Sequence, residues 1–161
     1  MRVIILPLIA LSLLISITPV FSGEHFGLML VKGSEIEKDH KEVLKWKQPA
    51  EEGDAQAQFK LGSLYYKGQG VTQSDEKALF WLKKSAKQNY TYAQFFIGAM
   101  YFGGFGVGLN YIEADKWFYI SEANGYEDEG HLREMIEKKM TREEIDVAKE
   151  LVREWMKVHQ K

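Results

Sequence analysis

Residues 57–65 read Ala-Gln-Phe-Lys-Leu-Gly-Ser-Leu-Tyr, and residues 93–101 read Ala-Gln-Phe-Phe-Ile-Gly-Ala-Met-Tyr. The two segments lie 36 residues apart, and the same spacing separates further identical residues: Gly68 and Gly104, Ala78 and Ala114, Trp81 and Trp117. Self-similarity at a fixed period of about 20–50 residues is the sequence signature of a repeat protein. The sequence therefore predicts a structural unit of 36 residues that is used at least twice.

The start and stop signals of helices follow the same spacing. Ser74 and Asn110 are residues whose side chains accept hydrogen bonds from the free amides of a first helical turn. Gly53, Asn89 and Gly125 are also 36 residues apart, and Gly and Asn best tolerate the left-handed conformation that ends a helix. Each unit is therefore predicted to hold two helices, near residues 55–66 and 75–87 in the first copy, joined by a Gly-rich loop.

Small residues recur at positions where the two helices of a unit would touch. They are Ala57, Gly62 and Ala78 in the first copy, and Ala93, Gly98 and Ala114 in the second. Two helices approach closely only where their side chains are small, and one pair cannot bury its apolar face alone, so the units are expected to stack. Trp81 and Trp117 would then fill the space between successive pairs, as core residues rather than as a binding box.

The flanking segments fit a stack of such units. Residues 23–53 are predicted to form a degenerate first repeat, whose second helix Pro49 should distort because proline has no amide hydrogen. Residues 126–161 are predicted to form C-terminal capping helices. Thr141 and Glu144 have the spacing of a capping box. The helix that they open is predicted to be charged except for an apolar stripe at Ile145, Ala148, Val152 and Trp155.

These motifs resemble those of the Sel1-like repeat family, relatives of the tetratricopeptide fold, over residues 40–157 and in the form found in exported bacterial members. The units are predicted at residues 54–89 and 90–125. The expected fold is all-α: a short right-handed α-solenoid of antiparallel helix pairs with a C-terminal capping helix. The resemblance implies an adaptor that presents a concave helical face to another protein. Tyr90-Thr91 in place of Asp54-Ala55, and Glu122 where the family usually has Ala, are departures from the family pattern.

The first residues of the chain have the layout of a secretory signal. Arg2 supplies a positive charge, Val3 to Ile17 is almost entirely apolar, and Pro19 precedes small residues that suit cleavage after Ser22. The apolar run is short for a membrane span of about 20 residues. We therefore expect an exported chain that starts at Gly23 and acts in the periplasm or after secretion. A membrane-tethered scaffold with an uncleaved N-terminus is the alternative.

The composition argues against most chemistry. The chain has no cysteine, which excludes disulfides and thiol nucleophiles, and its formal net charge of −2 gives no reason to expect nucleic acid binding. The loop at residues 103–108 superficially resembles a phosphate-binding loop, but it joins two predicted helices instead of following a strand. We therefore expect no enzymatic activity, no cofactor and no metal. A hydrolase of cell-wall-like compounds, an activity associated with cysteine-rich relatives, is the weaker alternative.

The expected partner is another protein or a peptide, bound by a monomer, with contact to a membrane only if the N-terminus stays uncleaved. The binding surface is expected on the inner side of the first helix of each unit. The candidate contact residues there are Gln58, Lys60, Tyr66, Gln94 and Phe102.

Overall fold

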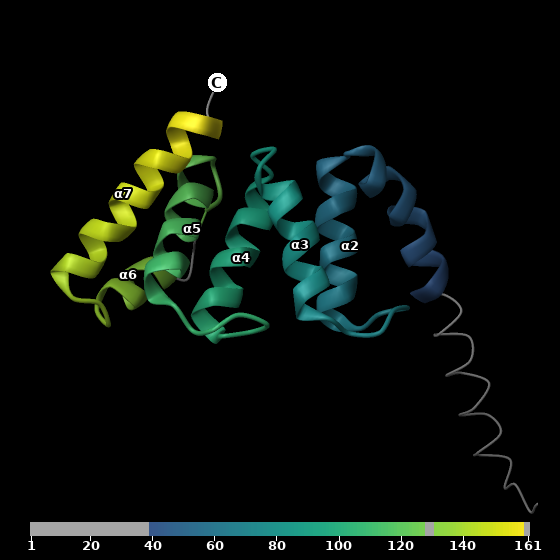
Figure 1. Cartoon of the computed structure of the whole chain (residues 1–161), viewed down its shortest axis with the longest axis horizontal. Helices are drawn as coiled ribbons and strands as arrows, with labels where there is room; N and C mark the ends of the chain where they lie inside the picture. The colour runs from purple at the N-terminus through teal and green to yellow at the C-terminus, as the bar shows by residue number, and fades with distance from the viewer. Residues whose placement is uncertain (1–38, 128–130, 160–161) are drawn as a thin grey trace, which may run out of the picture. The chain divides into compact units, whose positions relative to one another are not determined.

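The computed structural model describes residues 39–127 and 131–159. The described residues all belong to one compact unit of the chain. They form seven helices and no strand (Figure 1): residues 39–52, α2 (Ala55–Lys67), α3 (Asp75–Ala86), α4 (Thr91–Gly103), α5 (Tyr111–Ala123), α6 (Leu132–Glu137) and α7 (Arg142–His159). None of these helices is both long and apolar enough to span a membrane.

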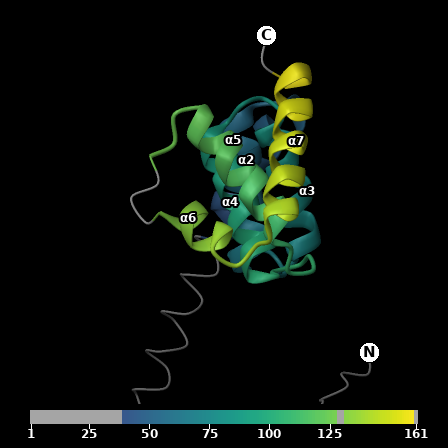
Figure 2. The same cartoon turned by 90° about the vertical axis from the view of Figure 1, so that its left-hand side faces the viewer.

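The helices associate in pairs, as the 36-residue spacing predicts. α2 packs on α3 and α4 packs on α5, while α3 also contacts α4 and thereby joins the two pairs. α5 contacts both α6 and α7, which lie on different sides of it in Figure 2. The predicted all-α fold of stacked helix pairs is confirmed, and both helices of the first predicted unit match their expected bounds to within one residue.

The caps lie where the sequence predicts them. The Ser74 Oγ accepts a hydrogen bond from the Lys77 amide at 3.2 Å, and Asn110 Oδ1 accepts one from the Glu113 amide at 3.0 Å. The residues expected in the left-handed conformation have positive φ angles: 107° at Gly53, 61° at Asn89 and 92° at Gly125.

The capping box of the last helix is also confirmed, because Thr141 and Glu144 exchange hydrogen bonds between their side chains and amides. The apolar stripe that follows faces the rest of the domain: Ala148 and Val152 are buried, and Ile145 and Trp155 are partly buried.

Two glycines set how closely the paired helices approach. A Cβ atom added at Gly62 would lie 2.9 Å from Cγ of Leu82 on α3, and one added at Gly98 would lie 2.9 Å from the ring of Phe118 on α5. The small residues that the repeat predicts at these contacts, Ala57, Ala78, Ala93 and Ala114, are completely buried. Every helix pair is therefore packed directly on the backbone of its first helix.

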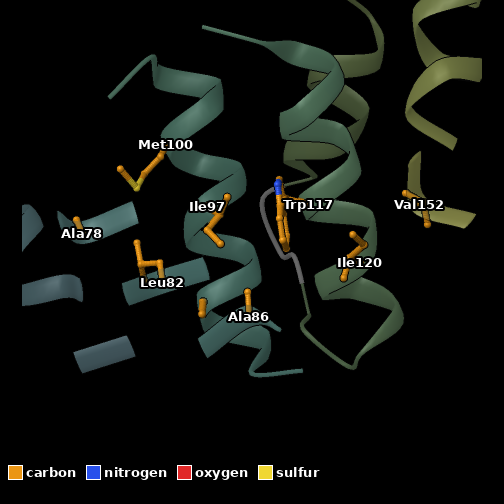
Figure 3. Close-up of a cluster of buried hydrophobic side chains, with 9 residues drawn as sticks. Ala78, Leu82, Ala86, Ile97, Met100, Trp117, Ile120 and Val152 are labelled. Atoms are coloured by element: carbon orange, nitrogen blue, oxygen red, sulfur yellow. The ribbon is translucent and has the colours of Figure 1, made fainter. Parts of the chain in front are cut away.

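The core between the two pairs is built from α3, α4, α5 and α7. Trp117, with 3% of its surface exposed, lies between Ile97 on α4 and Val152 on α7 (Figure 3). Trp81 instead packs, partly buried, against a second cluster that includes Val43 and Leu61. Both tryptophans therefore act as core residues between successive helices.

The helix at residues 39–52 contains Pro49, the residue that is expected to distort it. Pro49 does not end this helix, which continues to residue 52. Because proline has no amide hydrogen, it removes one backbone hydrogen bond from this last turn. The Pro49 carbonyl still accepts a hydrogen bond from the Asp54 amide at 3.0 Å. The first helix of the degenerate repeat and the predicted signal segment lie outside the described residues.

A charged network joins α6 to α5. The guanidinium group of Arg133 bonds Asp115 at 3.0 Å, Glu122 at 3.1 Å and Glu137 at 2.9 Å, and it lies over the ring of Tyr119. The Asp115 side chain is only 1% exposed. Burial raises the pKa of Asp115 above its ordinary value, although the neighbouring Arg133 acts to lower it. Burial disfavours the ionised form of Asp115, and the positive charge of Arg133 stabilises that form.

We expect Gly98→Val to lower the free energy of unfolding by about 1–3 kcal/mol, because the new side chain must displace the buried ring of Phe118. Chemical denaturation measures this change. Gly108→Ala is the matched control, since an added Cβ at Gly108 meets no atom within 4 Å. Equal stabilities of the two variants would contradict the close-approach interpretation.

We expect Arg133→Met to lower the free energy of unfolding by about 2–4 kcal/mol, less than for a fully buried pair because Arg133 is partly exposed. Without Arg133, the folded-state pKa of Asp115 should rise further above its unfolded-state value. Such a carboxyl stabilises the fold at low pH, and this contribution is lost as the pH rises through its folded-state pKa. The deficit should therefore be smaller at about pH 5 than at about pH 7.5.

Denaturation of the double variant Asp115→Asn/Arg133→Met provides the control for this prediction. The double variant should regain part of the lost stability at the higher pH, because the buried charge is gone. A deficit in Arg133→Met that does not change with pH would show that Asp115 is not the group responsible.

Candidate functional site

A line of aromatic rings crosses α2 and α4 and continues into the segments that follow α4 and α5. Successive ring centroids along it are 5.1–6.2 Å apart, and we call it the aromatic row: Tyr126, Tyr92, Phe59, Phe96, Tyr66 and Phe105. Tyr92 is 57% exposed and Phe105 is 49% exposed, while the rings between them are half-buried. An exposed run of apolar rings of this kind is typical of a surface that binds another molecule.

A groove of about 380 Å³ lies beside the aromatic row, between the helix at residues 39–52, α2 and α4. Its walls are Glu42, Trp46, Phe59, Lys60, Ser63, Leu64, Lys67, Gln69 and Phe96. The groove therefore combines aromatic walls with charged side chains from α2.

The uncompensated charge in this groove is positive. Glu42 accepts a hydrogen bond from the Trp46 indole at 2.6 Å and lies 3.7 Å from Lys45, so its charge is already partnered. Lys60 and Lys67 are exposed, and among the described residues no carboxylate lies within ion-pair distance of either. The groove is thus suited to a ligand that carries negative charge next to apolar groups.

Tyr90 lies beside the aromatic row, with its ring centroid 5.3 Å from that of Phe59. Burial raises the pKa of Tyr90, and the neighbouring Tyr92 and Asp54 raise it further. A phenol with a raised pKa stays protonated and acts as a hydrogen-bond donor instead of a base. Within residues 39–127 and 131–159, no three His, Asp or Glu side chains are grouped so that they could hold a metal ion. The arrangement is suited to binding.

The structure brings two of the predicted contact residues together at this site. Lys60 lines the groove, and Tyr66 is part of the aromatic row. Phe102 lies elsewhere: its ring contacts Tyr111, 6.1 Å away, and packs on the cluster around Phe118.

Gln58 and Gln94 do not lie on the accessible face, which corrects the expectation that they are exposed. They are 4% and 0% exposed, and their side-chain amides donate to the carbonyls of Ala50 and Ala86, each at 3.1 Å. Their side-chain oxygens accept hydrogen bonds from Gln88 and Asn124, respectively. Each glutamine therefore joins the preceding helix to the C-terminal end of its own pair.

Several residues of the site were not predicted from the sequence, namely Trp46, Tyr92, Phe96 and Phe105. The repeat contains a signal for two of them. Tyr92 and Phe96 stand 36 residues after the exposed Gln56 and Lys60, so the 36-residue spacing predicts that they share a face with the candidate contact residue Lys60. Trp46 and Phe105 required knowledge of how neighbouring units are placed.

Comparisons with known proteins agree with this architecture. The Sel1 repeat family model matches residues 55–90 and 91–126. The fold is similar to that of a protective antigen present in uropathogenic Escherichia coli strains that displays an SLR fold, with a TM-score of 0.66 and 28% identity over 84% of this chain and 29% of that one. A Sel1 repeat protein from Oxalobacter formigenes matches at 35% identity, over 52% of this chain and 34% of that chain, with a TM-score of 0.49.

This chain therefore spans about a third or less of the length of these two proteins. A comparison with curated proteins gives no match. The two matched segments coincide with the two helix pairs, since α2 and α3 lie in the first and α4 and α5 in the second. These two helix pairs are therefore identified as two consecutive Sel1 repeats.

Proposed function

We propose that this protein is an exported adaptor that binds a segment of another protein along the aromatic row and the adjoining groove. Sel1 repeats generally mediate protein–protein interaction. The observation that carries the proposal for this chain is the pairing of exposed aromatic rings with the unpartnered Lys60 and Lys67. Aromatic anchors surrounded by a polar rim are the usual composition of a binding surface, and the proposed role involves no catalysis.

The chemistry of the groove favours a particular kind of partner. Two unpartnered lysines select for acidic side chains, and the rings of Trp46, Phe59 and Phe96 select for apolar ones. We therefore expect the bound segment to carry Asp or Glu close to large apolar residues. A groove of this size accommodates a few side chains, which is consistent with a short segment rather than a large protein face.

Export rests on the N-terminal sequence. The charged start, the apolar run and the small residues before Gly23 support cleavage by a signal peptidase, and they place the binding module outside the cytoplasm in this proposal.

A photo-reactive amino acid placed at Tyr92 or Phe105 should form discrete crosslinked products with a partner in the native cell, because both side chains are exposed in the aromatic row. Gel shifts and mass spectrometry identify the products. The double variant Lys60→Glu/Lys67→Glu should remove most of them, since it reverses the charge that attracts the acidic segment.

Val147 is the matched control position, because it is 49% exposed but lies on α7, away from the aromatic row. Lys149→Glu, an exposed lysine on the same helix, is the control for charge reversal. The binding proposal fails if the Val147 position yields the same products, or if Lys149→Glu removes them as well as the groove variant does.

The mature protein is expected to begin at Gly23, which intact-mass measurement and N-terminal sequencing of protein from the native host will test. A chain that starts at Met1 and fractionates with membranes would replace export by the tethered alternative. Replacing Ser22 by a bulky residue should block cleavage and provides the control.

A further inference from the structure

A second pocket, separate from the aromatic row, lies between α3, α4, α5 and α7. Its volume is about 450 Å³, within the range of about 300–1,000 Å³ that is usual for small-molecule sites. It is lined by Lys83, Lys87, Tyr101, Asn110, Glu113, Lys116, Trp117 and Trp155. No residue of this pocket belongs to the aromatic row or its groove.

Two indole groups in the wall of this pocket have buried N–H donors without an acceptor. These are Nε1 of Trp117 and Nε1 of Trp155, whose rings meet edge to face with centroids 4.6 Å apart. Trp117 as a whole is only 3% exposed, and Figure 3 shows its nitrogen at the end of the ring that points away from Ile120. A buried donor without a partner costs about 1–3 kcal/mol, so an acceptor that reaches either indole N–H from the pocket would be stabilised by it.

The charges around these indoles are predominantly positive. Lys116 bonds Glu113 at 2.7 Å, and this pair is electrically neutral. Among the described residues, no carboxylate lies within ion-pair distance of Lys83 or Lys87, which leaves the pocket with a net charge of about +2. Glu113 is the one acidic side chain in the wall, and its own partner is Lys116.

The neutral polar groups of the wall add further donors. The Asn110 side-chain oxygen accepts a hydrogen bond from the Glu113 amide, and the Asn110 side-chain NH2 group remains available as a donor. Burial, and to a smaller extent Glu113, raise the pKa of Tyr101, so its phenol also stays protonated. The pocket thus offers cations and N–H and O–H donors around an aromatic wall, and few acceptors.

We propose that this pocket binds a small organic oxyanion with about two negative charges, carried on a phosphate group or on two carboxylates, and with a flat apolar part that packs on Trp117 and Trp155. Lys83 and Lys87 would neutralise the charge, and the indole N–H groups would donate to the oxygens. A ligand of this kind contacts α3, α5 and α7 together, so its binding also holds the C-terminal helix against the repeats.

Ligand binding can be followed by NMR, because the chemical shift of an indole N–H changes when the group gains a hydrogen-bond acceptor. The chain has four tryptophans, and 15N–1H spectra of the full chain resolve their indole N–H groups, assigned by single Trp→Phe variants. Titration with phenyl phosphate should shift the Trp117 and Trp155 signals with a Kd of about 1 mM or tighter. The Trp81 signal should stay in place, since Trp81 packs against the cluster around Val43 and Leu61 and lines neither the pocket nor the groove.

Two further probes separate the parts of the ligand. Phthalate tests whether two carboxylates replace the phosphate, and inorganic phosphate tests whether the charge alone suffices. Benzyl alcohol keeps the ring but has no charge, and we expect it to bind at least about tenfold more weakly than phenyl phosphate. Equal affinity for benzyl alcohol and phenyl phosphate would overturn the anionic part of the proposal.

The double variant Lys83→Met/Lys87→Met keeps the long side-chain stems but removes both charges, and it should weaken phenyl phosphate binding about tenfold or more. Lys84→Met is the matched control, because Lys84 is exposed and lies over Phe80 and Trp81, outside the pocket. This variant should bind phenyl phosphate with unchanged affinity. The absence of Trp117 and Trp155 shifts at about 10 mM of every probe, or unchanged affinity in the Lys83/Lys87 variant, would overturn the proposal.

Discussion

The close packing of each second helix on the backbone of the first helix of its pair sets the geometry of everything else in the described part of this protein. At Gly62 and at Gly98 there is no room for a Cβ atom, because Leu82 and the Phe118 ring already occupy that space. A pair packed this closely has one relative orientation, since any rotation would bring larger side chains into the contact. The same side of α2 and of α4 is therefore left facing outward, 36 residues apart in sequence.

The buried glutamines fix the next level of organisation. Gln58 and Gln94 each bond a carbonyl of the preceding helix and an amide side chain at the end of their own pair. Buried polar groups of this kind specify an arrangement more than they stabilise it, because they are satisfied in only one geometry. The position of one helix pair relative to the next, and hence the groove between residues 39–52 and α2, depends on these bonds.

Most of the fold was predictable from the sequence, and much of the candidate site was not. Caps, small residues and turn residues act through local geometry that repeats with the chain, so Ser74, Asn89 and Gly98 could be assigned from spacing alone. Spacing does not show which way a polar side chain faces, so Gln58 could not be distinguished from an exposed residue. The Arg133 network lies outside the repeat pattern and joins residues 18 positions apart, which no periodic signal could indicate.

The binding face owes its character to the exposed positions at which the two repeats differ. The small residues at the helix contacts are the same in both copies, but the positions of Gln56 and Lys60 in the first copy hold Tyr92 and Phe96 in the second. Because the repeat places equivalent positions on the same face, the lysines lie on α2, and Tyr92 and Phe96 on α4 add to the rings of Phe59 and Tyr66. A bound segment would meet these lysines on the α2 side and the added rings on the α4 side, which favours one orientation.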